Sequence, residues 1–337
     1  MSSVTPSEPV PNLQEDLGAR MRFLDKCRPR LEKLEQIRSE KLKTLESRKK
    51  LAVPIGVVMT PFLGFIDYWL ILFQSGNDDT AAGVSIAGLA MLWGWVTQPK
   101  RQYARAYKTK ILPEIARLFG DFRYAPKGKI RMQVLKPSKI VPQHQSYSSE
   151  DYFEGEYKNV GIHFSEIKLT KKSGRSTVTV FQGLAVLLTH GTRKFHGHTI
   201  LTKDQGKIGE WFKSRFSNLD RADLVDPEFE RLFDVYTNDQ VEARFLIDPL
   251  IVENLKTLHD EYSGTDMMAA FYQGHFLILI GSHKNHFEPS NIHVQATNED
   301  SLLSMHREIS QILSIVDRLS LYDRRALKRS QRAAASA

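Results

Sequence analysis

Two long apolar runs stand out from the mixed pattern of the chain. Residues 51–73 carry one charged side chain, Asp67, and residues 81–97 carry none. As α-helices they would be about 34 Å and about 25 Å long, against a hydrocarbon core of about 30 Å. The pattern predicts a two-helix transmembrane hairpin, with a buried helical hairpin of a soluble protein as the alternative.

The charges around these runs are asymmetric. The short polar link between them, residues 74–80, holds two Asp and no Lys or Arg, whereas both outer flanks are basic. This asymmetry predicts that both termini are cytoplasmic. The basic residues are Arg38, Lys41, Lys43, Arg48, Lys49, Lys50, Lys100, Arg101, Arg105, Lys108 and Lys110.

Asp67 is the one ionisable residue inside a predicted span, which makes it a candidate functional residue. It could relay a proton or an ion. The alternative, which we favour, is that its carboxylate reaches the interface or a neighbour's hydroxyl. Small residues in both runs predict a close helix–helix seam, or else a homo-oligomer contact through the same face.

The polar flanks divide into four predicted segments. Residues 1–12 form a disordered N-terminus, and residues 13–50 form a charged helical segment that Pro29 splits. Residues 98–124 form a connecting amphipathic helix, with apolar side chains every four residues from Tyr103 to Phe119. The remaining segment, residues 326–337, is a basic disordered tail.

Residues 125–325 show the alternation of a cytoplasmic α+β domain. The predicted strands cover 129–135, 160–170, 176–188, 198–203, 229–237, 241–247, 267–272 and 276–281, with tight turns at 173–174 and 273–274. Helices are predicted from Asp248 to about Asp260 and, as a C-terminal amphipathic helix, from Asp300 to Arg325. The hairpins predict a mainly antiparallel sheet.

Composition narrows the functional classes. The 337 residues are 41% hydrophobic and 26% charged, with a formal net charge of +8 and one cysteine, Cys27. The single cysteine excludes an internal disulfide and a multi-cysteine zinc site. The chain has no phosphate-binding GxxxxGK[ST], HExxH, GxSxG or CxxC motif. No catalytic residue and no cofactor is predicted, and a non-enzymatic role is favoured.

Three weaker candidate sites remain. His196 and His198 lie two apart, so on a strand they would share a face and could bind a metal if a third ligand converged; chance spacing is the favoured alternative. A mostly acidic block, which we call the acidic block, could form a ligand or partner surface. Core packing, a turn and the pairing of Glu242 with Arg244 along one strand face explain it better. Its residues are Asp226, Glu228, Glu230, Asp239, Glu242 and Arg244. The basic tail residues Arg324, Arg325, Lys328 and Arg329 could contact anionic lipid, or could simply be solvated. Nucleic acid is not a predicted partner.

Several stretches resemble the bacterial DUF3137 family. They are residues 149–169, 180–184, 194–201, 226–249, 287–290 and 316–321, of which DPEFE…VYTNDQVEAR is the most distinctive. The resemblance implies paired membrane segments before a cytoplasmic domain, in a bacterial inner membrane. It also suggests a LemA-type membrane protein as partner, and it brings no activity or catalytic residue. The chain departs from the family pattern at residues 189–193.

These observations predict a membrane-anchored, cytoplasmic-facing adaptor that binds another membrane or envelope protein. The alternative is a tethered module that binds lipid or a small ligand, and a tethered enzyme ranks third.

Overall fold

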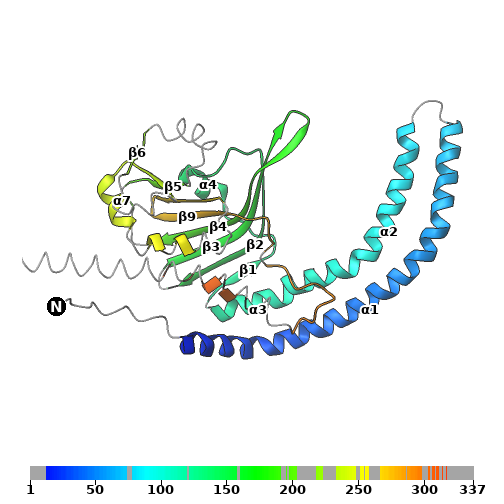
Figure 1. Ribbon diagram of the computed structural model, residues 1–337, viewed down its shortest axis with the longest axis horizontal. Coiled ribbons are helices and arrows are strands. Elements are labelled where there is room, and N and C mark those ends of the chain that lie inside the picture. Colours follow the sequence, from blue (N-terminus) through cyan, green and yellow to red (C-terminus); the bar gives the residue numbers. More distant parts are fainter. Residues whose placement is uncertain are drawn as a thin grey trace, which may run out of the picture. The chain divides into compact units, whose positions relative to one another are not determined.

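The computed structural model describes residues 13–73, 78–119, 121–157, 160–190, 195, 197–202, 218–222, 233–247, 251–253, 255–257, 266–285 and 287–297, and seven helical residues between 303 and 316. The chain forms two compact units. One comprises residues 1–112 with 288–302, and the other comprises residues 113–287 with 303–337. Figure 1 shows the helices of the first unit and the sheet of the second.

Two long helices build the first unit. Helix α1 runs from Leu13 to Phe73, and α2 runs from Asp78 to Ala106. Their contacts pair residues in opposite directions along the chain: the Ser85 hydroxyl donates to Asp67, and the Arg48 guanidinium donates to the carbonyl oxygen of Trp95 at 2.6 Å. Both apolar runs are thus helical and packed against each other, while their position in a membrane remains a prediction.

The predicted break at Pro29 is wrong, because α1 continues through this residue and also through Pro54 and Pro61. A proline inside a helix removes one hydrogen bond and costs about 3 kcal/mol. Side chains on both sides of Pro29 are buried, which offsets that cost. They are Phe23, Cys27, Leu31 and Leu34, each at most 7% exposed.

A π turn explains how the four-residue apolar repeat stays on one face. Four residues of an α-helix rotate by about 400°, so such a repeat drifts by about 40° at each step. The π turn at Tyr107–Ile111, between α2 and α3 (Leu112–Ala116), has a wider turn that reverses the drift. Tyr103, Tyr107, Ile111 and Ile115 are all buried as a result. A 3-10 turn, Arg117–Phe119, completes the helical stretch.

A nine-stranded sheet forms the second unit, in the order β1-β2-β3-β4-β9-β8-β5-β7-β6. Every described pair of strands is antiparallel, so the predicted α+β class is confirmed. The strands are β1 Arg123–Ala125, β2 Ser146–Tyr157, β3 Val160–Ser173, β4 Ser176–His190, β5 Thr199–Thr202, β6 Asp220–Arg221, β7 Asp234–Thr237, β8 Met267–Tyr272 and β9 His275–Gly281.

Both faces of the central strands are buried. On one face the segment between β1 and β2, which contains α4 (Met132–Leu135) and a 3-10 turn (Lys136–Ser138), packs Leu135 and Ile140 against Ala185, Leu187 and neighbours. On the other face an aromatic cluster joins Phe153, Phe164 and Phe287, with ring centroids 4.5 to 5.9 Å apart. A strand that is buried on both faces has a continuous apolar sequence, and residues 276–280 and 184–188 have such sequences.

Three local predictions need correction. Residues 241–247 form helix α7 (Gln240–Leu246) instead of a strand, and α4 occupies most of the strand predicted at 129–135. Strand β2 was not predicted, because its acidic sequence lacks a run of β-branched residues. The turn between β3 and β4 lies at 174–175, one residue later than predicted, and the turn at 273–274 is confirmed.

The predicted C-terminal helix falls largely outside the described residues. Its described positions are helical, and Ile309 and Val316 are buried. In the predicted helix after Asp248, six residues between Ile251 and Thr257 are described, and all six are helical. Both helices as wholes remain predictions.

Candidate functional site

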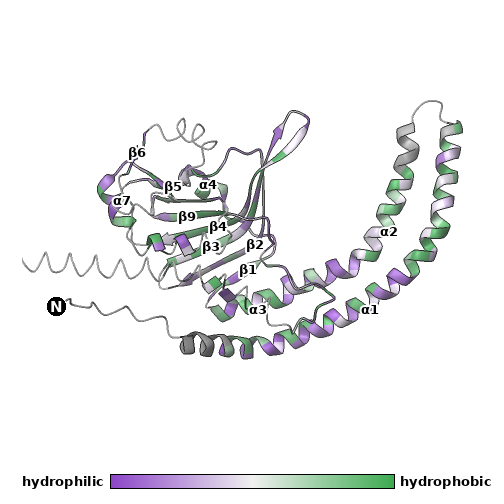
Figure 2. Ribbon diagram, in the orientation of Figure 1, coloured by the Kyte–Doolittle hydropathy of each residue, from purple (hydrophilic) through white to green (hydrophobic). Residues whose placement is uncertain are grey.

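Large apolar side chains are exposed along both helices of the first unit. On α1 they include Val57, Val58 and Phe65, which are 65% to 71% exposed, and on α2 they include Met91 and Trp93, which are 78% and 70% exposed. Figure 2 shows the apolar stretches of both helices. We name this surface, residues 51–72 and 84–95, the apolar belt. Such a surface requires lipid or protein to cover it.

Among the described side chains, one helix is long and apolar enough to cross a bilayer, within Met21–Leu70 of α1. Basic side chains border the belt. The Arg48 guanidinium lies 4.9 Å from the centroid of the Trp95 ring and donates to Gln98 at 2.7 Å. A cation and an indole together at the end of an apolar surface are typical of a membrane interface.

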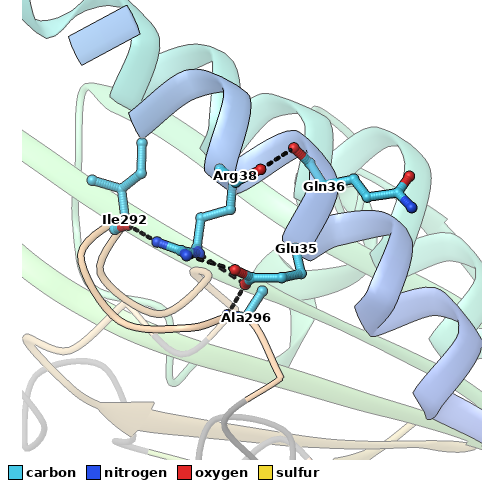
Figure 3. Close-up of polar contacts among 6 residues, drawn as sticks. Glu35, Gln36, Arg38, Ile292 and Ala296 are labelled. Atoms are coloured by element: carbon cyan, nitrogen blue, oxygen red, sulfur yellow. Dashed lines mark hydrogen bonds and ion pairs between the residues drawn. The ribbon is translucent and has the colours of Figure 1, made fainter. Parts of the chain in front are cut away.

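Residues 288–297 belong to the first unit, where they contact α1 (Figure 3). We name this segment the strap. Arg38 Nη1 donates to the carbonyl oxygen of Ile292 at 2.7 Å, and the backbone N–H of Ala296 donates to Glu35 Oε2 at 2.7 Å. A further ion pair joins Lys108 to Glu288 at 2.6 Å. The strap thus contacts both α1 and the π turn that follows α2.

Glu35 and Arg38 hold each other in place. The two residues lie about one helical turn apart on α1, and the Arg38 guanidinium donates two hydrogen bonds, of 2.8 and 2.5 Å, to the Glu35 carboxylate. The bond from Arg38 holds the pKa of Glu35 below its usual range, and Glu35 in turn raises the pKa of Arg38. Only 7% of Arg38 is exposed, so its charge depends on this partner.

The second unit carries a row of polar side chains along one margin of the sheet. The Tyr152 hydroxyl donates to Glu154 at 2.8 Å and lies 2.9 Å from His163 Nδ1. Farther along, Thr189 contacts His275 Nδ1 at 3.1 Å. Tyr272 and His198 continue the row, with stacked rings 5.9 Å apart. We name these residues the polar row.

Burial sets the protonation of the polar row. It lowers the pKa values of His163, His198 and His275, and a second contribution at His275 is repulsion from His163. Burial also raises the pKa values of Tyr152 and Tyr272. These histidines and tyrosines are therefore uncharged at neutral pH, and they can offer hydrogen bonds to a polar ligand.

The histidine pair does not form a visible metal site. His196 lies outside the described residues, and His198 Nε2 donates to the carbonyl oxygen of Ser138 at 2.9 Å. Among the described residues, no three His, Cys, Asp or Glu side chains gather closely enough to hold a metal ion.

The described members of the acidic block have local structural roles. Asp239 caps α7 by accepting from the N–H of Glu242, and Glu242 Oε2 accepts from the N–H of Gly197 at 2.6 Å. The predicted pairing of Glu242 and Arg244 on a strand face is wrong, because both lie on α7. Asp226, Glu228 and Glu230 lie outside the described residues, as do the tail residues Arg324, Arg325, Lys328 and Arg329.

Asp67 meets the hydroxyl of Ser85 on α2, which is the contact that the favoured alternative predicts. The polar row and the strap were not predicted from the sequence. Glu35 and Arg38 do carry a signal, since opposite charges three residues apart pair on a helix. The polar row carries no local signal, because its members come from five strands whose order the sequence does not state.

Comparisons with known proteins agree with the family resemblance. Residues 179–321 match the model of a family described as "Protein of unknown function (DUF3137)". Over these residues, which are less than half of the chain, the chain is similar to this family. The match begins after the resembling stretch at 149–169, and it includes most of β4 and all of β5 to β9.

No curated protein matches the chain. A crystal structure of the mycobacterial trehalose monomycolate transport factor A, TtfA, is similar over 59% of this chain and 90% of that one, with 12% identity and a TM-score of 0.31. A similarity at this TM-score supports no statement about the fold or function of this chain.

Proposed function

We propose that this protein is anchored in a bacterial inner membrane and serves there as an adaptor for another membrane or envelope protein. The apolar belt carries this proposal, because α1 exposes ten large apolar side chains between Leu51 and Leu72, which water does not favour. Both helices cross the bilayer as a hairpin, and the sheet unit lies on the cytoplasmic side, where the basic flanks lie.

The exposed face of α7 is the surface we assign to the partner. Val241 is 81% exposed, and Arg244 and Phe245, three and four residues later, lie on the same face of the helix. An apolar and cationic face on a short helix, held at its start by Asp239, suits a complementary protein surface. A LemA-type membrane protein is the partner that the family resemblance suggests.

Purification of the full-length tagged protein in nanodiscs tests the adaptor role. We expect a stoichiometric membrane protein to co-purify with the wild type and to be lost from the double variant Val241→Glu/Arg244→Glu. Both positions are exposed, so the variant should fold. The matched control is Lys127→Glu/Lys129→Glu, two exposed positions away from α7, which should keep the partner.

A clean protein that carries one enriched lipid or metabolite would contradict the adaptor role. It would favour the alternative, a tethered module for lipid or a small ligand. The polar row is the observation that supports this alternative, because its half-buried His163 and His275 could bind a polar group.

A further inference from the structure

Strands β3 and β4 extend beyond their neighbours in the sheet. The pairing of β2 with β3 ends at Thr170, and the pairing of β9 with β4 ends at Gly183. Residues 171–180, which we name the arm, pair only with each other among the described strands, and all ten are exposed. Figure 1 shows the arm as a hairpin that projects from the sheet.

The arm is cationic. Lys171, Lys172 and Arg175 lie on it, and the exposed Lys168 lies at its base. The sequence has no Asp or Glu between Glu166 and Asp204, so the arm itself contains no acidic residue that would offset its positive charge. A strongly positive, projecting element favours a polyanionic partner.

The arm also exposes apolar side chains. Val178 and Val180 are 47% and 36% exposed, and the strand register places Val178 directly beside Lys171. Side chains alternate along a strand, so Lys168 and Lys172 share the opposite side. Cations beside an apolar pair match the boundary between phosphate groups and acyl chains.

We propose that the arm binds the surface of a bilayer that contains anionic phospholipid. The lysines and Arg175 pair with lipid phosphates, and the two valines enter the headgroup layer. This inference rests on the proposed membrane anchoring, which keeps a bilayer near the sheet unit. Single-stranded nucleic acid fits less well, since residues 171–180 contain no aromatic side chain on which a base could stack.

Vesicle flotation with the full chain in phosphatidylcholine nanodiscs tests the arm. Vesicles with about one-third phosphatidylglycerol should capture the wild type, and pure phosphatidylcholine vesicles should not. Each cation near an anionic surface contributes about fivefold. The variant Lys168→Gln/Lys171→Gln/Lys172→Gln/Arg175→Gln should therefore bind at least about tenfold more weakly. Val178→Ser/Val180→Ser should weaken binding severalfold at unchanged charge.

A charge-matched control removes four exposed cations elsewhere: Lys127→Gln/Lys129→Gln/Lys136→Gln/Lys284→Gln. It should bind like the wild type. Equal loss in both quadruple variants, or no loss in the arm variant, would overturn the inference. So would a polynucleotide that displaces the vesicles at a much lower phosphate concentration. If the chain does not insert into nanodiscs, that result contradicts the proposed membrane anchoring and not the inference about the arm. Flotation of the detergent-purified chain with the same vesicles then still tests the arm.

Discussion

Replacement of Gly183 by alanine is expected to destabilise the sheet by about 3 kcal/mol or more. Gly183 has a φ of +154°, and a Cβ atom there would lie 2.0 Å from the carbonyl oxygen of Ile280 and 2.7 Å from the backbone nitrogen of Ser282. Both are backbone atoms of the β9 region, so no rotamer change can relieve the overlap. The two central strands would have to separate.

Urea unfolding of the full chain in detergent, followed by near-ultraviolet circular dichroism, measures this loss. The matched control is Gly161→Ala on β3, where a Cβ would make ordinary contacts, the nearest being 3.6 Å from the Thr189 carbonyl oxygen. The control should change the free energy of unfolding by less than about 1 kcal/mol. Equal effects at both positions would contradict the close approach of β4 and β9.

Replacement of Arg38 by alanine is expected to release the strap. The change leaves the carbonyl oxygen of Ile292 and the carboxylate of Glu35 without their bonds from Arg38. The loss of a largely buried charged partner should cost about 2 to 3 kcal/mol. Amide exchange of residues 288–297, measured by mass spectrometry, should then be about 30- to 150-fold faster.

Arg28→Ala is the matched control, because Arg28 pairs with Asp25 on the same helix at 3.6 Å while both side chains are 66% exposed. An exposed pair contributes at most about 1 kcal/mol, so exchange in the strap should not change. Similar exchange in wild type and Arg38→Ala would show that the strap is held by other contacts.

The same pair predicts a pH dependence. The pKa of Glu35 is lowered in the folded protein, so its stabilising contribution is present above the unfolded pKa and is lost as pH falls through the folded pKa. Protection of Ala296 should therefore fall under acid conditions, and Glu35→Gln should remove that dependence.

Local patterns predicted the elements that have a continuous apolar sequence or clear turn residues. The two apolar runs, the turn at 273–274 and strand β8 followed from hydropathy and turn residues alone. Strand β2 did not, because its sequence is mostly polar. Its strand conformation depends on pairing with β3 and not on its composition. At α7, valine and phenylalanine suggested a strand, while the cap at Asp239 determined a helix.

The site residues divide in the same way. Glu35 and Arg38 are one helical turn apart, so their pairing could be predicted, but the bond from Arg38 to Ile292 joins positions 254 residues apart. The polar row likewise depends on strand order. His163 and His275 come together only because β4 lies between β3 and β9. No spacing in the sequence reports such an arrangement.

Cysteine labelling in intact cells tests the membrane anchoring most directly. Native Cys27 is fully buried, and burial raises the pKa of its thiol to about 12, so it should stay unlabelled. We expect a membrane-impermeant maleimide to label Ser75→Cys, between the apolar runs, and to label Ser176→Cys, on the arm, only after the membrane is permeabilised. Labelling of Ser176→Cys in intact cells, or recovery of the protein in the soluble fraction, would contradict the account.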